Sequence, residues 1–361
     1  MLPTSSSLLR EETPSAPFGR QALLTLVRLG VGIGLLGYLD KSGLIGFRAL
    51  ERLLTAWPLT LAAVALILVD VALMGLRLSY LFRPHGLRMP VGTALRLTLV
   101  SFFFGTFLPG AAGGDLAKLF YATRETSGRK AEVATIVIFD RAVGLFSLLI
   151  LPLFFAPLFP QLIAGVPLLR LLLISSAAFA SAMMAAFLAC LLHESVVRRI
   201  ANRIGIRPLR ELVARVLQTI GSYRRSPVTL LSALGISLLA NLSIIAVTAL
   251  AVLAVNPAGV SARMCLIIPI GHIANSLPLT PGGLGVGETA FDTLFRLARL
   301  SGGAEALLCW RIWTALVSVG GLFFYLRGVD RCVFEADPPE VAEKVEPGEP
   351  EVVPRPTAPA L

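Results

Sequence analysis

The chain has 361 residues, of which 55% are hydrophobic and 15% are charged, and its mean hydropathy is +0.79. Soluble domains carry about a quarter charged residues, so this composition excludes an ordinary soluble fold and indicates a membrane protein. The formal charge of +10 falls in short loops between apolar runs, which is typical of contact with lipid headgroups. We therefore expect a lipid partner and no nucleic acid.

Taken in chain order, residues 1–20 are rich in Ser and Pro and contain no apolar core followed by a cleavage site. This pattern predicts a disordered cytoplasmic N-terminal tail. Six later runs are apolar over about the 20 residues that a spanning helix needs. These runs are residues 21–39, 57–76, 132–158, 168–192, 227–255 and 304–326.

Two further apolar runs, 91–108 and 263–279, lead into stretches that are broken by proline and glycine and end in a carboxylate. Such residues end helices, and at membrane depth a non-helical chain persists only where protein or water covers it. A matched pair of such breaks points to a translocation site near the midplane, with freed backbone N–H groups as donors. The two stretches comprise Pro109, Gly110, Gly113, Gly114 and Asp115, and Pro278, Pro281, Gly282, Gly283, Gly285, Gly287 and Glu288.

Charge decides whether these two runs cross the membrane. If 91–108 crossed fully, the basic residues from Lys118 to Lys130 would face the side opposite Arg77, Arg83 and Arg88. A hairpin that enters and returns avoids this conflict and places all of them, Arg77 included, on the cytoplasmic side. The second hairpin must then enter from outside, which places Arg296 and Arg299 outside.

The resulting prediction is an all-α polytopic protein of the cytoplasmic membrane, with about six spanning helices and two re-entrant hairpins in an inverted repeat. The transmembrane domain covers 21–331, with one half at 21–160, the other at 168–331, and both termini cytoplasmic. Residues 193–226 are basic and predict an amphipathic surface helix, either as an anchor or as a lipid-recruiting element. Residues 332–361 are acidic and Pro-rich and predict a disordered tail.

Cysteines and histidines are scattered along the chain without the spacing of a metal site or a disulfide framework. We expect no metal and no cofactor. The glycine run 282–287 does not have the spacing of a dinucleotide-binding loop, and no strand precedes it. Transport, if it occurs, is then passive or coupled to an ion gradient.

Three motifs carry a resemblance to a known family. They are Leu108-Pro109 with Gly113-Gly114-Asp115 and Lys118; Phe139-Asp140-Arg141 followed by Gly144-Leu145; and the segment from Pro278 to Glu288. Together they resemble the lysylphosphatidylglycerol synthase transmembrane-region proteins, also called flippase-like. The resemblance implies a membrane protein that moves or handles an anionic, aminoacylated or isoprenoid lipid. Since only a short acidic tail follows Arg331, where synthesising relatives carry a soluble transferase domain, we expect transport and not aminoacyl transfer.

Charged side chains at bilayer depth cost roughly 2.5 to 3.5 kcal/mol each on insertion scales, so those in the apolar runs need a partner or a task. Asp140 and Arg141 form either a local ion pair or a site in which Arg141 and Lys118 bind a lipid phosphate. Asp115 and Glu288 would hold these cations, bind an amino or hydroxyl group, or carry a proton. Asp70 lies in no motif, and we expect it to be a buried, hydrogen-bonded carboxylate.

The alternative function is a membrane enzyme, or a subunit of one, that acts on polyprenyl-phosphate or hopanoid lipids with these carboxylates as acid and base. A third interpretation is a membrane anchor for an enzyme partner. The sequence leaves the oligomeric state open.

Overall fold

The computed structural model describes residues 55–107, 112–124, 129–192, 210, 219–276, 285–327 and 335–336. Within this part, five helices are long and apolar enough to cross a membrane. They are α3 (Trp57–Phe82), α6 (Lys130–Phe155), α8 (Pro167–Leu192), α11 (Pro227–Val255) and α14 (Gly303–Leu326). The protein is therefore an all-α polytopic membrane protein, as predicted. The sixth predicted span, 21–39, and the N-terminal tail lie outside the described residues.

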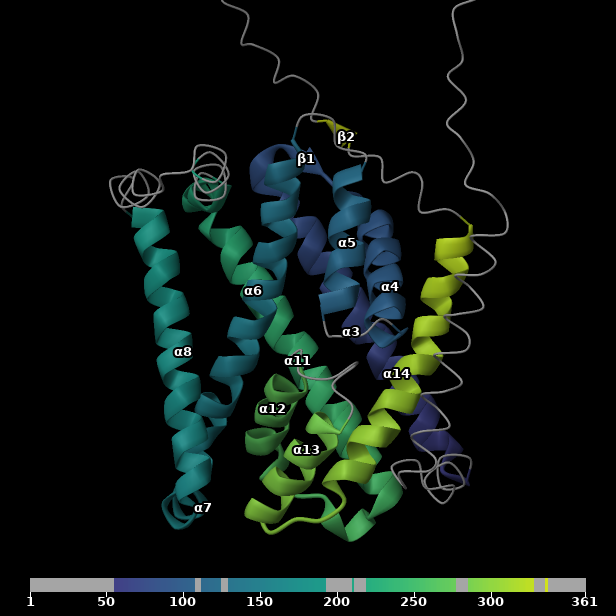
Figure 1. Ribbon diagram of the computed structural model, residues 1–361, viewed down its shortest axis with the longest axis vertical. Helices are drawn as coiled ribbons and strands as arrows, with labels where there is room; N and C mark the ends of the chain where they lie inside the picture. Colours follow the sequence, from purple (N-terminus) through teal and green to yellow (C-terminus); the bar gives the residue numbers. More distant parts are fainter. Residues whose placement is uncertain are drawn as a thin grey trace, which may run out of the picture.

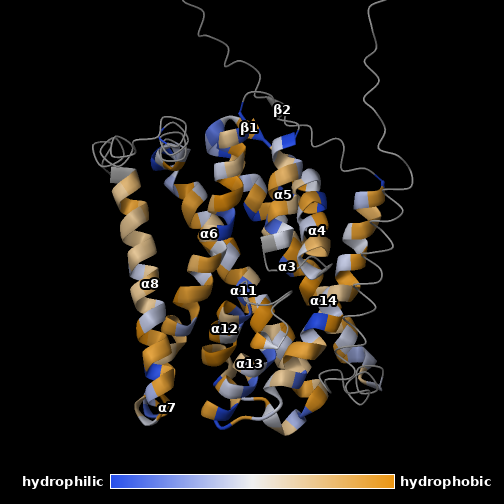
Figure 2. Cartoon of the chain, in the orientation of Figure 1, coloured by the Kyte–Doolittle hydropathy of each residue, from blue (hydrophilic) through white to orange (hydrophobic). Residues whose placement is uncertain are grey.

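Apolar residues cover the length of the long helices, whereas hydrophilic residues gather at β1 and at the base of α12 and α13 (Figure 2). Large apolar side chains such as Phe154 and Val228 point outward with 76% and 73% of their surface exposed. In a soluble protein such a surface would promote association, but in a bilayer it faces lipid tails.

Local chemistry sets the helix boundaries. Pro58 and Pro227 occupy the first turns of α3 and α11, where a missing N–H is no loss. At its other end α3 runs six residues beyond the predicted limit of 76 and stops before Pro84. Arg77 is consequently a buried helix residue, 5% exposed, and not the cytoplasmic loop residue that its charge predicted.

Both predicted hairpins are present as pairs of short helices. In the first, α4 (Val91–Phe107) packs on α5 (Ala112–Arg124), and in the second, α12 (Met264–Asn275) packs on α13 (Val286–Leu297). The first hairpin lies in the half of the molecule that contains β1, and the second lies toward the end that contains α7 (Pro160–Gly165) (Figure 1). The two hairpins thus enter from opposite ends. Their connecting segments, 108–111 and 277–284, with Pro109, Gly110, Pro278, Pro281, Gly282 and Gly283, fall outside the described residues.

Helix packing follows the inverted repeat. The repeat relates the helices of the first half, α3 to α6, in order to those of the second half, α11 to α14. The first helices of the two halves, α3 and α11, pack on each other at the centre. The contact of α4 with α14 matches the contact of α12 with α6, and the contact of α3 with α14 matches that of α11 with α6. Each hairpin therefore packs against the last span of the other half. α8 packs on α6.

Two segments outside the helical core differ from prediction. Glu335 and Ala336, from the predicted disordered tail, form β2 and pair antiparallel with β1 (Leu87–Arg88). Tyr223, from the predicted surface helix 193–226, is fully buried, and its hydroxyl donates to the Leu81 carbonyl at 2.8 Å. Burial raises the pKa of this phenol, so it stays protonated and donating. Of residues 193–226, only 210 and 219–226 are among the described residues.

Candidate functional site

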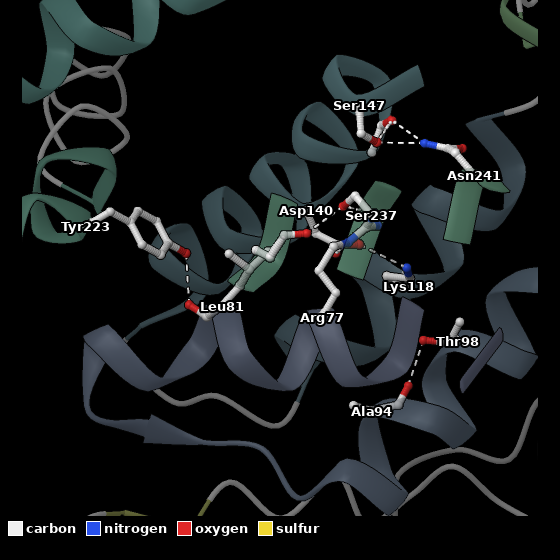
Figure 3. Close-up of polar contacts among 12 residues, drawn as sticks. Arg77, Leu81, Ala94, Thr98, Lys118, Asp140, Ser147, Tyr223, Ser237 and Asn241 are labelled. Atoms are coloured by element: carbon white, nitrogen blue, oxygen red, sulfur yellow. Dashed lines mark hydrogen bonds and ion pairs between the residues drawn. The ribbon is translucent and has the colours of Figure 1, made fainter. Parts of the chain in front are cut away.

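A buried charged cluster joins four helices around Asp140 of α6. Arg77 of α3 donates from Nε to Asp140 Oδ1 at 2.7 Å, and Lys118 of α5 donates from Nζ to Oδ2 at 3.3 Å. Arg77 also donates from Nη1 to the Ser237 hydroxyl of α11 at 2.8 Å. Figure 3 shows both cations pointing at Asp140 from different helices. We call these four residues the Asp140 cluster.

The Asp140 cluster carries two cations and one anion, and the three charged residues are at most 6% exposed. Buried charges are tolerated when each is paired and hydrogen-bonded, and Asp140 accepts from both cations while Ser237 accepts from Arg77. The backbone makes room for this arrangement at Gly144. A Cβ there would lie 3.0 Å from Arg77 Nη1, which accounts for the glycine that follows Asp140 by one helical turn.

Arg141 does not pair with its neighbour Asp140. Its Nε lies 3.3 Å from Asp115 Oδ2, in the first turn of α5. Of the two alternatives for these residues, the local ion pair is not formed, because adjacent residues on a helix point in different directions. The side chains of Arg141 and Asp115 are 43% and 36% exposed, so this pair remains accessible.

In the other half, Glu288 pairs with Arg311 of α14. Glu288 Oε1 lies 2.8 Å from Arg311 Nε, and Oε2 accepts from the Gly285 backbone N–H at 2.7 Å, capping α13. Arg311 also donates from Nη2 to Asn275 Oδ1 of α12 at 2.8 Å. The side chains of Glu288 and Arg311 are only 5% and 18% exposed. Gly287 adjoins this site, and a Cβ there would overlap Asn275 Oδ1.

The two pairs are equivalent under the inverted repeat. In each, a carboxylate in the first turn of a hairpin's second helix binds an arginine of the next spanning helix. Sequence reasoning missed Arg77 and Arg311. A signal for Arg311 existed, since it follows Glu288 at nearly the spacing by which Arg141 follows Asp115.

The structure thus sorts the predicted site residues into three groups. Lys118 and Asp140 come together, Asp115 and Arg141 come together, and Glu288 binds residues of its own half. A common cavity for Asp115 and Glu288 remains a prediction. Of the glycines at the breaks, Gly114 packs so closely on α4 that a Cβ would overlap the Ser101 carbonyl oxygen, and Gly285 has a φ of +80°. Gly113 is also buried, in the first turn of α5.

Two other buried groups lie apart from these pairs. His272 packs edge-on against Phe291 and Trp310 and lies 3.3 Å from the Thr248 hydroxyl, so it is a packed histidine of the helix core. Asp70 is 5% exposed, as predicted, but its Oδ1 has no hydrogen-bond partner among the described residues. In this part of the chain, no three His, Cys, Asp or Glu side chains are placed to hold a metal ion.

The described helices form an inverted repeat whose two hairpins carry buried or half-buried ion pairs, which places the chain among the all-α polytopic membrane proteins. Residues 25–321 match the family described as the lysylphosphatidylglycerol synthase TM region, and the chain belongs to this family. No curated protein and no solved structure matches the chain significantly.

Proposed function

We propose that this protein translocates a lipid with an anionic, aminoacylated or isoprenoid-phosphate headgroup across the cytoplasmic membrane, with both of its termini on the cytoplasmic side. The observation that carries the proposal is the pair of equivalent ion pairs, Asp115–Arg141 and Glu288–Arg311, one in each oppositely inserted half. Transport requires a site that can be presented to either side, and repeated polar groups on two opposed hairpins supply one.

Arg141 is the proposed headgroup contact. Its guanidinium is half-exposed and its pairing with Asp115 is loose, so a phosphate can compete for the planar fork with two parallel hydrogen bonds. Asp115 would then be free to accept from an amino or hydroxyl group of the same headgroup. Lys118, which the sequence suggested as a second phosphate ligand, is buried against Asp140. We assign it a positioning role, holding α5 against α6.

The two sites differ in a way that fits one stage of a transport cycle. Asp115 and Arg141 are accessible, whereas Glu288 and Arg311 are shielded and further tied to Asn275. In an inverted repeat, exchanging the conformations of the two halves exposes the other site. The proposal therefore includes a second state in which the Glu288–Arg311 pair opens.

The test is reconstitution of the full-length protein in liposomes that contain fluorescent phosphatidylglycerol in both leaflets. A membrane-impermeant reductant bleaches the outer leaflet only. Translocation makes the protected inner-leaflet fluorescence bleach as well, at a rate set by the protein. Protein-free liposomes should keep this fluorescence, and liposomes with Arg141→Ala should lose it much more slowly than those with wild type.

The same samples separate transport from catalysis. Leaflet exchange without chemical change supports transport, whereas a new lipid species on a chromatogram after incubation with polyprenyl phosphate supports the membrane-enzyme alternative. Folded protein that neither moves nor changes these lipids would contradict the proposed function for this headgroup class.

A further inference from the structure

Asp70 lies half-way along α3 and is buried in the contact between the two halves of the protein. It adjoins a small cavity whose wall comes from α3, from the first hairpin and from two helices of the second half. The other lining residues are Ile67, Phe102, Ile244, Val247, Trp310 and Thr314. Asp70 Oδ1 is buried there with no hydrogen-bond partner among the described residues.

This environment does not support an ionised carboxylate. An unpaired charge away from water carries a large desolvation cost, and carboxyl groups in that position take up a proton instead. Four of the six neighbours are aliphatic or phenyl side chains, and the Thr314 hydroxyl already donates to the Trp310 carbonyl at 2.7 Å. Asp70 is therefore a neutral carboxylic acid in this conformation.

Among the described residues, the other charged groups near α3 do not provide a counter-ion. Arg77 lies two turns further along α3 and is held by Asp140 of α6. α11 carries no charged residue, and none of the cavity residues from α4, α11 or α14 is titratable. The remaining charged residues on the helices that pack against α3 are either exposed or paired with another residue. The exposed ones are Arg96 of α4, Lys130 of α6 and Glu305 of α14. The paired ones are Glu132 with Arg129, Arg141 with Asp115, and Arg311 with Glu288.

The size and chemistry of the cavity identify its ligand. It has room for no more than about one water molecule, which excludes a lipid headgroup. A metal cation needs several oxygen ligands, and beside the carboxylate the lining offers only one hydroxyl side chain. A proton needs one carboxylate and, when it is released, one water.

We propose that Asp70 is the proton-binding residue of this membrane domain, and that its proton exchange couples a pH gradient to the movement of the two halves. When the halves part, water enters the cavity, the carboxylic O–H bond breaks, its electron pair stays on Asp70 and the proton passes to water. Reprotonation from the other side lets the cavity close again. The coupling half of this inference rests on the proposed lipid transport, whereas the proton-binding half does not.

Infrared spectroscopy of the purified protein near neutral pH tests the proton-binding half. Wild type should show the carbonyl band of a protonated carboxylic acid, Asp70→Asn should lack it, and Asp70→Glu should shift it. Asp292→Asn is the control: the band should persist in this variant, because Asp292 of α13 is half-exposed and paired with Arg296 outside the cavity. A wild-type spectrum without this band, or one that Asp70→Asn leaves unchanged, would overturn the proposal.

Liposomes with an imposed pH gradient test the coupling. In wild type, one pH unit should bias the fluorescent phosphatidylglycerol between leaflets by up to about tenfold if one proton moves with each lipid. With Asp70→Asn the lipid should still exchange but distribute evenly. If wild type moves lipid with no bias, or Asp70→Asn is biased equally, the coupling is wrong. If wild type moves no lipid, the transport proposal fails and the infrared result alone decides the role of Asp70.

Discussion

Asp140 and Arg141 show how partner choice at the scale of single residues depends on helix geometry. They are adjacent in the sequence, yet Asp140 points into the bundle toward Arg77 and Lys118, while Arg141 reaches Asp115 at a half-exposed position. Two roles follow from this difference. The buried residue holds helices together, and the accessible one is available to a ligand.

Replacing Arg141 separates these roles. Arg141→Ala should reduce lipid translocation in liposomes by roughly 10- to 100-fold, since hydrogen bonds to charged groups contribute about 1.5 to 3 kcal/mol. Arg141→Lys should retain part of the rate, because the charge stays but the planar fork is lost. The yield of folded protein should not change. Lys130→Ala, which removes an exposed cation at the start of α6, serves as the control. Normal transport per molecule in Arg141→Ala would contradict the assignment.

The Asp140 cluster makes the opposite prediction. Asp140→Asn leaves Arg77 and Lys118 buried together without an anion, which should destabilise the fold by about 3 to 5 kcal/mol. Lys118→Met leaves one cation, Arg77, paired with one anion, Asp140, and should lower the free energy of unfolding by clearly less. Thermal unfolding in detergent, followed by tryptophan fluorescence, compares the two. A lower melting temperature for Lys118→Met than for Asp140→Asn would mean that the second buried cation stabilises the fold.

At the scale of helices, the contact between the halves depends on close approach at glycine. Gly321 of α14 faces α4 so closely that a Cβ would overlap the Leu99 carbonyl oxygen, whereas its neighbour Gly320 has open space around it. Gly114 likewise allows a close backbone contact between α4 and α5 within the first hairpin. Glycine at such positions lets helix backbones approach closely enough to pack.

Alanine at the two adjacent glycines tests this packing. Gly321→Ala should destabilise the protein by about 1 to 3 kcal/mol, as overpacking does, and lower the amount of monodisperse protein in detergent. Gly320→Ala should be neutral or slightly stabilising, because alanine is the better helix former. Equal behaviour of the two variants would show that α4 and α14 do not approach as closely as described.

At the scale of the whole molecule, the inverted repeat fixes which ends of the helices share a side. α6 runs from the end of the bundle that carries β1 to the end that carries α7 (Figure 1), so the first residue of α6, Lys130, and the last residue of α7, Gly165, belong to opposite ends. The pairing of β1 with β2 brings the chain beyond α14 to the end where α3 finishes. The excess of Lys and Arg near these segments predicts that the end that carries β1 faces the cytoplasm.

Cysteine labelling in intact cells checks this orientation. In a chain without its native cysteines, an impermeant thiol reagent should label a cysteine that replaces Gly165 from outside. Cysteines that replace Lys130 or Arg210 should react only after the membrane is opened. All three positions should behave the same way before and after permeabilisation if the protein lies on the membrane instead of crossing it, and external labelling at Lys130 would reverse the orientation.

The sequence by itself determined the elements whose cause is local. Runs of apolar residues long enough for a bilayer predicted the spans, to the residue for Pro227–Val255, and clusters of proline and glycine predicted both hairpins. Charge asymmetry predicted that the hairpins enter from opposite ends. Each of these signals is read from neighbouring residues, because backbone hydrogen bonding inside a bilayer must be satisfied within the segment itself.

Only the tertiary structure decided which charges meet. The end of the apolar run placed Arg77 in a loop. In the structure Asp140 of α6, far away in the sequence, pairs with Arg77, so α3 continues past this residue to Phe82. The partner of Glu288, and the lack of one for Asp70 Oδ1 among the described residues, likewise depend on helix faces brought together by packing. The free energy of a buried charge is set by groups within a few ångströms in space, and the order of residues along the chain does not specify that neighbourhood.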